Sequence, residues 1–132
     1  MPPTTTSVAL TDGIRVSVTS RYVPEQSAPR LGRYVWSYTI RITNEGTSAA
    51  RLSSRHWIIT DAHGKEQEVR GDGVVGEQPV LPPGTSFRYT SGAVIDTPVG
   101  TMQGSYRMRA DDGHDFDAEI PTFRLAVPNV LN

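Results

Sequence analysis

Residues 34–43 read YVWSYTIRIT, the longest run in the chain in which apolar and polar side chains alternate. Large apolar residues occupy every even position from 34 to 42, and the odd positions are mostly polar. Because successive side chains of a β-strand point to opposite faces, this period of two predicts a half-buried strand. The run ends at Asn44-Glu45-Gly46, a turn-forming sequence.

Similar but less regular runs occur along the rest of the chain. They cover residues 13–19, 51–60, 65–70, 87–91, 101–109 and 116–127. Turn-forming residues separate them, and no window shows sustained helical spacing. About seven short strands predict an all-β protein, an antiparallel β-sandwich. Pro121 interrupts the last run, so a bulge, a change of sheet or an edge is expected there.

Length and composition predict one domain spanning residues 1–132, with the first few residues disordered. The chain has no cysteine, which excludes disulfides, thiol catalysis and thiolate metal sites. It shows no secretion signal, and no apolar run approaches the ~20 residues that cross a bilayer. The sequence therefore predicts a cytoplasmic protein that does not insert into a membrane.

Charge is unevenly distributed, although the net charge is only −1. Residues 1–60 carry seven arginines and three carboxylates, a net charge of +4, which leaves −5 for residues 61–132. The overall balance gives no reason to expect a long-range field that attracts polyanions. Nucleic acid is therefore not expected as a partner.

Seven motifs are spread over nearly the whole chain. They read SRYVPEQS at 20–27, YTIRITN at 38–44, RHWIITD at 55–61, GDGVVGEQP at 71–79, YTSG at 89–92, GSYRM at 104–108 and IPTFRL at 120–125. Together they closely resemble the ApaG family of small bacterial proteins.

The resemblance implies a fibronectin type III-like β-sandwich, which agrees with the strand pattern. It also implies an association with cobalt resistance and magnesium efflux in bacteria. The domain is similar to the C-terminal module of some eukaryotic F-box and polymerase-interacting proteins, for which protein binding is the expected role. None of these associations names a reaction.

Gly71, Gly73 and Gly76 form a GxGxxG pattern. In a dinucleotide-binding unit such glycines lead from a strand into a helix whose amides meet the pyrophosphate. Here three prolines within the next seven residues oppose a helix. One interpretation is a phosphate-binding nest of backbone amides, to which Arg55 or Arg70 adds charge. The other is a tight connection in which glycine supplies positive φ or a close backbone approach.

Two groups of side chains are candidates for metal ligands. Asp115, Asp117 and Glu119 share one face of a predicted strand, and carboxylate oxygens suit Mg²⁺ or Ca²⁺. Carboxylates at alternate strand positions equally form a solvated outer face. His56 and His63 lie on one predicted hairpin, where a transition metal ion and simple packing are the alternatives. The sequence assigns no metal ion and no cofactor.

These observations predict a non-enzymatic protein-interaction module with no catalytic residues. An unidentified protein partner would bind a sheet face, a sheet edge or the glycine segment, and edge pairing between two copies would give a homodimer. The alternative function is binding of a nucleotide or pyrophosphate at residues 71–76. Serines and histidines are present, but nothing in their context indicates a catalytic triad.

Overall fold

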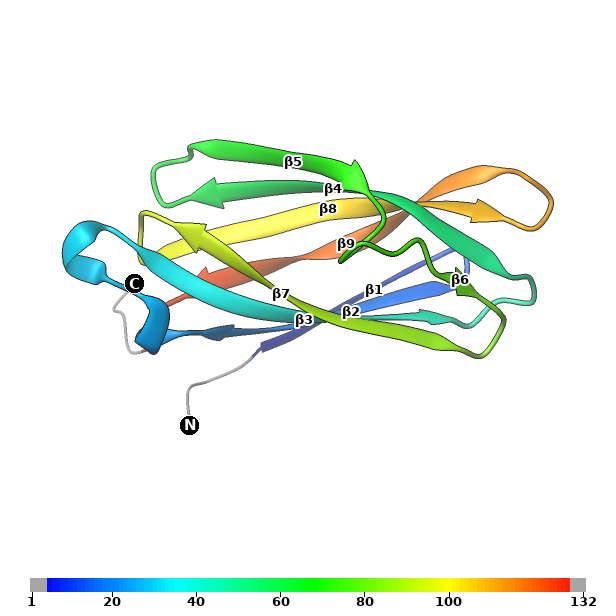
Figure 1. The fold of residues 1–132 in the computed structure, drawn as a ribbon, viewed down its shortest axis with the longest axis horizontal. Coiled ribbons are helices and arrows are strands. Elements are labelled where there is room, and N and C mark those ends of the chain that lie inside the picture. Colours follow the sequence, from blue (N-terminus) through cyan, green and yellow to red (C-terminus); the bar gives the residue numbers. More distant parts are fainter. Residues whose placement is uncertain (1–4, 129–132) are drawn as a thin grey trace.

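The computed structural model describes residues 5–128, which form two stacked sheets (Figure 1). The strands are β1 (Thr5–Thr11), β2 (Ile14–Tyr22), β3 (Tyr34–Asn44), β4 (Ala50–Asp61), β5 (Glu66–Asp72), β6 (Val80–Leu81), β7 (Ser86–Ile95), β8 (Val99–Ala110) and β9 (Asp115–Ala126). Two short 3₁₀ helices, η1 (Pro24–Gln26) and η2 (Pro29–Leu31), connect β2 to β3. The predicted disorder at the start of the chain concerns residues outside the described range.

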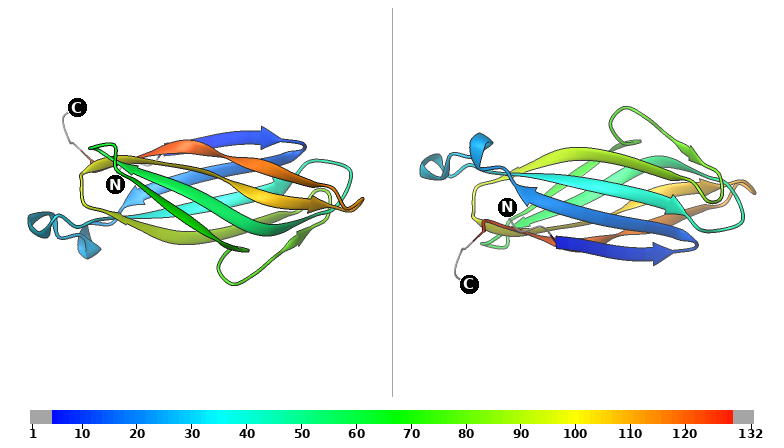
Figure 2. Two further views of the ribbon diagram at one scale, coloured as in Figure 1. Left: turned by 90° about the horizontal axis from the view of Figure 1, so that it is seen from above. Right: turned by 90° about the horizontal axis from the view of Figure 1, so that it is seen from below.

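The strand order is β1-β2-β3-β7 in one sheet and β5-β4-β8-β9 in the other, with β6 paired to the start of β4. All pairings among the described residues are antiparallel, and the two layers are seen stacked in Figure 2. The predicted antiparallel β-sandwich is confirmed. The structure also contains β1 and β6, which the sequence did not predict. Strand β1 is mostly polar and β6 has only two residues, so neither shows a clear alternating pattern.

Aromatic side chains of both sheets meet in the core. Tyr22, Trp36, Tyr38 and Trp57 are all buried, as expected for apolar side chains on the inner face of a strand. The ring centroids of Tyr38 and Trp57, from opposite sheets, lie 5.4 Å apart, and those of Trp57 and Phe123 lie 6.0 Å apart. Burying a large apolar side chain contributes about 1.5–3 kcal/mol. This aromatic cluster is therefore a main source of cohesion between the sheets.

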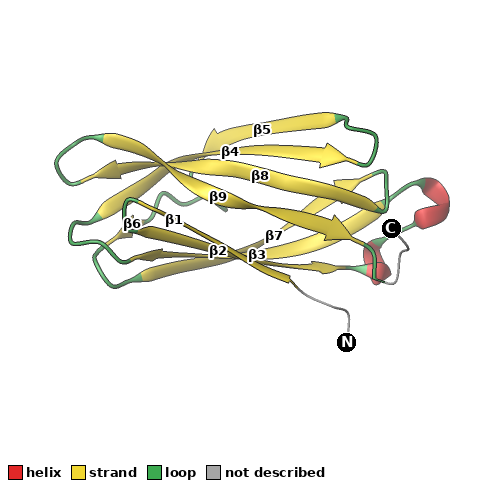
Figure 3. Cartoon of the chain, turned by 180° about the vertical axis from the view of Figure 1, so that it is seen from behind, coloured by secondary structure: helices red, strands yellow, loops and turns green. Residues whose placement is uncertain are grey.

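One long side of the sandwich is closed, because β9 packs against β1 and β2 of the other sheet (Figure 3). The backbone N–H of Glu119 donates to Thr11 Oγ1 at 3.1 Å. Further along the strand, Trp36 Nε1 donates to the carbonyl oxygen of Ala126 at 3.3 Å. These hydrogen bonds join the two sheets along the closed side.

The predicted irregularity at Pro121 is a bulge. Gly104 of β8 pairs with Ile120 of β9, but Met102 pairs with Phe123, so two residues of β9 lie opposite one residue of β8. A bulge leaves the extra residue outside the hydrogen-bond ladder, which suits a proline because it has no N–H to donate. Strand β9 thus runs through Pro121 without changing sheet.

Candidate functional site

The glycine segment forms a tight hairpin that follows the end of β5. Val74 and Glu77 exchange both backbone hydrogen bonds, with N to O distances of 2.8 and 2.9 Å. Between them, Val75 and Gly76 have positive φ angles of 44° and 81°. Positive φ at both central residues is what a two-residue type I′ turn requires. The chain then continues to β6 and not to a helix, so the geometry of a dinucleotide-binding unit is not formed.

Each glycine of the pattern meets a different steric need of this hairpin. A Cβ atom on Gly73 would lie 2.1 Å from the carbonyl oxygen of Glu77. A Cβ atom on Gly71 would lie 2.8–2.9 Å from the guanidinium of Arg55. Gly76 has open space around it, but its φ of +81° is one that other residues rarely adopt. These contacts agree with the interpretation of the pattern as a tight connection.

Three backbone amides of the segment are already bonded within the protein. The amide of Gly73 donates to the carbonyl oxygen of Ser53 at 2.9 Å, and those of Val74 and Glu77 bond each other's carbonyls. A phosphate-binding nest needs successive amides aimed at one anion, and these three are directed at carbonyl oxygens instead. Phosphate binding at this segment stays a prediction.

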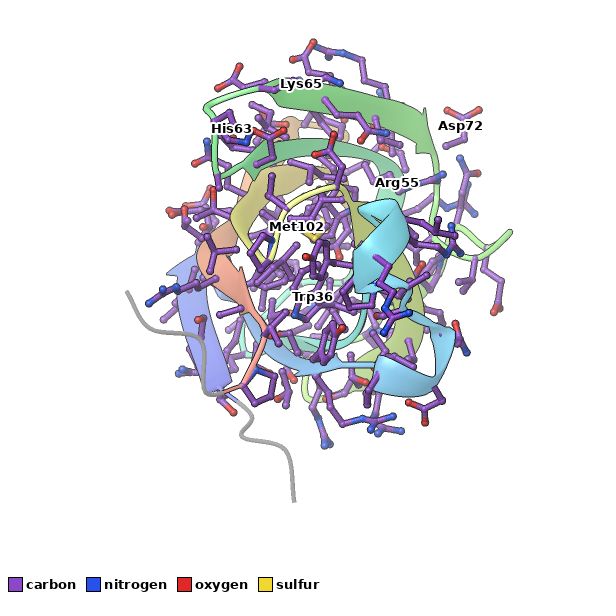
Figure 4. The ribbon with its side chains drawn as sticks, turned by 90° about the vertical axis from the view of Figure 1, so that its left-hand side faces the viewer. Trp36, Arg55, His63, Lys65, Asp72 and Met102 are labelled. Carbon is purple, nitrogen blue, oxygen red and sulfur yellow. The ribbon has the colours of Figure 1, made fainter. Side chains whose placement is uncertain are left out.

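Arg55, on β4, forms hydrogen bonds with the backbone at the base of the hairpin. Its Nη1 donates to the carbonyl oxygens of Asp72 and Gly73, both at 2.9 Å. Arg55 and Gly71 are register partners on neighbouring strands, which places the guanidinium over the space that a side chain at 71 would fill. In an end-on view, Arg55 and Asp72 lie on the same side of the molecule (Figure 4). The arginine predicted to add charge for an anion thus binds backbone carbonyls.

Arg70 extends into solvent beside Glu68. Its side chain is 70% exposed, and its Nη2 lies 3.7 Å from Glu68 Oε1. It meets Arg55 and Gly71 at a hollow of about 540 Å³. The remaining lining residues are Ser54, His56, Asp72, Ser105, Arg107 and Asp117. The structure therefore brings together three of the five predicted phosphate-binding residues, while Gly73 and Gly76 are not part of this lining.

A cleft lies along the second long side of the sandwich, which is open because β5 and β7 are outer strands there and do not pair. It contains an inner hollow of about 290 Å³ and an outer hollow of about 330 Å³, and both are lined by Ile59. Val69 and Met102 form apolar walls of the inner hollow, and Met102 is seen between the two sheets in Figure 4. Lys65 and Val94 border the outer hollow.

Three tyrosines with buried rings, which the sequence did not indicate as a group, place hydroxyl groups beside the inner hollow. Tyr38 and Tyr89 line it, and the hydroxyl of Tyr89 hydrogen-bonds that of Tyr106. Burial raises the pKa of all three phenols, although the nearby positive charge of Arg55 acts in the opposite direction. The hydroxyls are therefore neutral at pH 7 and can both donate and accept hydrogen bonds.

Val75, at the tip of the hairpin, was also missed by sequence reasoning. It is 56% exposed, has a φ of 44° and borders the inner hollow. A β-branched residue is rare at positive φ, where asparagine or glycine is favoured. Val75-Gly76 occupies the two central positions of the turn, where Asn-Gly is the usual sequence. A valine in place of the usual asparagine was the signal in the sequence that could have identified Val75 as unusual.

Two of the three carboxylates predicted as metal ligands are paired with arginines of β8. Arg109 Nε donates to Asp115 Oδ1 at 2.8 Å, and Arg107 Nε donates to Asp117 Oδ1 at 2.7 Å. The hydrogen bond from Arg109 lowers the pKa of the Asp115 carboxyl. Glu119 lies on the same face of β9. Within residues 5–128, no group of three or more His, Cys, Asp or Glu side chains could hold a metal ion.

The two histidines of the β4–β5 hairpin take part in separate contacts. His56 Nε2 lies 3.0 Å from Glu68 Oε1. His63 is exposed in the turn, where its backbone N–H donates to Asp61 Oδ1 at 2.8 Å. The contacts agree with packing and turn formation on this hairpin.

The fold and the cleft define a small antiparallel β-sandwich with one open side. A hairpin held by hydrogen bonds from Arg55 borders the cleft on that side. A family model described as the ApaG domain matches residues 24–110. The chain belongs to the ApaG family, as its seven motifs predicted. For the described residues, we find no helix of the length and apolarity needed to cross a membrane. The cytoplasmic location stays a prediction.

Relatives match over most of the chain. Protein ApaG of Thiobacillus denitrificans is 62% identical over 119 residues, which cover 90% of this chain and 94% of that protein. Protein ApaG of Aromatoleum aromaticum is 60% identical over 119 residues, with the same coverage. The crystal structure of the putative ApaA protein from Bordetella pertussis superposes with a TM-score of 0.85 at 49% identity, covering 98% of this chain and 99% of that one.

Proposed function

We propose that this protein is a non-enzymatic protein-interaction module that holds an extended segment of a partner protein in the cleft between β5 and β7. The observation that carries the proposal is the conformation of Val75. A left-handed backbone costs a residue with a side chain about 1–2 kcal/mol, and at 56% exposure this valine gains little burial in return. A partner that covers Val75 would supply the missing burial.

The strands that border the cleft offer a backbone surface as well. An outer strand leaves N–H and C=O groups unpaired, and an extended peptide can pair with them while alternate side chains enter pockets. Strand β5 carries Glu66, Glu68, Arg70 and Asp72 among seven residues, whereas Arg88 is the one charged residue among ten in β7. Because charges oppose edge pairing, we assign the partner segment to β7.

The size of the two hollows favours side chains over a complete small molecule. At about 290 and 330 Å³ they lie just below and just above the lower limit of the range of about 300–1,000 Å³ for ligand pockets. The inner hollow combines apolar walls with the hydroxyls of Tyr38 and Ser91 and with Arg55. It suits a partner side chain that has an apolar stem and a hydrogen-bonding end. The link to cobalt resistance and magnesium efflux implied by the family resemblance would then act through this partner.

A phage-displayed library of random ten-residue peptides provides the test. Selected peptides are synthesised and titrated into ¹⁵N-labelled protein. We expect saturable amide shifts at Val75, Ser91 and Val94, along the cleft. Val75→Asn should keep or raise the stability, because asparagine suits positive φ, and should weaken peptide binding at least tenfold. Val80→Asn changes a similarly exposed valine outside the cleft lining and should leave the affinity unchanged.

The proposal is overturned if every selected peptide shifts residues away from the cleft, or if Val75→Asn binds as tightly as the original protein. A parallel ATP titration tests the nucleotide alternative, for which the hollow between Arg55 and Arg70 is the supporting observation. Saturable shifts confined to residues 70–76, with no peptide selected, would favour a nucleotide. Sedimentation velocity shows whether the protein forms a homodimer, the state expected if a second copy pairs with the edge of β7.

A further inference from the structure

The outer face of the four-stranded sheet carries arginines and hydroxyl groups without carboxylates. The register places Val8, Ser17, Arg41 and Arg88 side by side in one row across β1, β2, β3 and β7. The next row is threonine on all four strands. No outward-facing position of these strands, within the described residues, is acidic. Figure 2 shows this sheet in the view from below.

Arg41 and Arg88 form an uncompensated pair of like charges. They are direct register partners and both are exposed. Within residues 5–128, no ion pair joins either of them to a carboxylate, whereas Arg15 at the end of the face is bonded to Glu45 at 2.6 Å. Like charges directly opposite one another on a sheet are destabilising. An acidic group placed between Arg41 and Arg88 would remove this repulsion.

The outer face of the other sheet differs because it also carries carboxylates. Two of its outward arginines, Arg107 and Arg109, have Asp117 and Asp115 as register partners, at N to O distances of 2.7 and 2.8 Å. These two positive charges have their counter-charges within the protein, whereas exposed Arg51 and Arg124 on the same sheet have no ion pair among the described residues. Strands β1, β2 and β3 all belong to the N-terminal half of the chain, which carries the net positive charge. The uneven charge along the sequence therefore makes the outer face of their sheet more positive than that of the other sheet.

Apolar side chains at one border identify the chemistry of the partner. Val8 and Leu10, on β1, are 50% and 55% exposed and lie in the same rows as the arginines. We propose that this face binds an acidic segment of a protein, with carboxylates against Arg41 and Arg88 and apolar side chains against Val8 and Leu10. This surface is separate from the cleft, and its test does not depend on the proposed function of the cleft.

A nucleic-acid backbone fits the same face less well. The outward positions of the four strands present no aromatic side chain on which a base could stack. The protein as a whole carries a net charge of −1, so a long polyanion is repelled by the acidic C-terminal half. A short acidic segment avoids that repulsion and also covers the apolar border.

The test uses a defined probe, a twelve-residue peptide of alternating glutamate and leucine, titrated into ¹⁵N-labelled protein. A matched peptide with glutamine for glutamate and a twelve-nucleotide single-stranded DNA serve as comparisons. We expect saturable shifts at Val8, Ser17, Arg41 and Arg88 with the glutamate peptide only. Arg88→Ser should weaken binding at least tenfold, while the control Arg107→Ser on the other sheet should bind as before.

A stability measurement adds a readout that needs no partner. If Arg41 and Arg88 repel each other, Arg88→Ser raises Tm by about 1–3 °C at low salt and by less in 0.5 M NaCl. A lower Tm would contradict the repulsion on which the proposal rests. Equal binding of the glutamine peptide, or shifts confined to the cleft, overturns the proposed face. Tighter binding of DNA through the same arginines assigns the face to a nucleic-acid backbone instead.

Discussion

The two long sides of the sandwich differ in how they are joined. On one side β9 packs against β1 and β2, with a hydrogen bond from the backbone of Glu119 to Thr11. On the other side β5 and β7 remain unpaired, and a hairpin held by Arg55 borders the cleft between them. The closed side joins the sheets, so the open side can expose backbone edges and an apolar hairpin tip. The following variants test this division, beginning with the hairpin.

Gly73→Ala should have the largest effect. A Cβ atom there would lie 2.1 Å from the carbonyl oxygen of Glu77, and the φ of +59° adds backbone strain. We expect a loss of about 3 kcal/mol or more in the free energy of unfolding, measured by urea denaturation. The control is Gly76→Ala, at the position directly before Glu77. Gly76 also has positive φ but has open space around it, so this variant should lose only about 1 kcal/mol. Equal losses for both variants would show that the contact with Glu77 is not the cause.

The tyrosine pair beneath the open side should have an intermediate effect. Removing one hydroxyl, by Tyr106→Phe, leaves that of Tyr89 buried without its partner and should cost about 1–2 kcal/mol. The double variant with both tyrosines changed to phenylalanine should lose less than the sum of the single variants, because neither hydroxyl then remains unpaired. Additive losses would contradict a direct bond between the two hydroxyls.

The same pair predicts alkaline sensitivity. Burial raises the pKa of both phenols above the value near 10 of the unfolded chain, so the unfolded state releases its protons first as pH rises. The stability should therefore hold up to about pH 10 and fall above it. The double phenylalanine variant should show a shallower fall in thermal unfolding measured against pH.

Asp115→Asn, on the closed side, should have the smallest effect and the opposite pH dependence. The hydrogen bond from Arg109 lowers the pKa of Asp115 in the folded state below its unfolded value near 3.9. The resulting stabilisation is present above that value and is lost as pH falls through the lower, folded pKa. At pH 7 the variant should be slightly less stable, and this difference should shrink below about pH 4. A constant difference from pH 7 to pH 2 would exclude the ion pair as its source.

Much of the fold was predictable from local patterns. The alternation along residues 34–43 identified both the strand and its buried face. The lack of an N–H in Pro121 predicted a bulge, a change of sheet or an edge, and the structure has the bulge. The missed strands are those with weak patterns: β1 exposes Val8 and Leu10 on its outer face, and β6 is too short to show a period. The turn character of the glycine segment was also predictable, because the following prolines oppose a helix.

The sequence determined which residues form strands and which side chains share a face, because parity along a strand is a local property of the backbone. Apart from the predicted hairpin that pairs β4 with β5, only the tertiary structure decided which strands became neighbours and in what register. That register sets Arg41 beside Arg88, which are far apart in the chain, and Arg55 over Gly71 within the β4–β5 hairpin. The packing of β9 against β1, with β5 and β7 left unpaired, likewise decided which side of the sandwich is open. The pairing of β3 with β7 and the position of the open side both depend on contacts between distant segments, which period-two patterns do not encode.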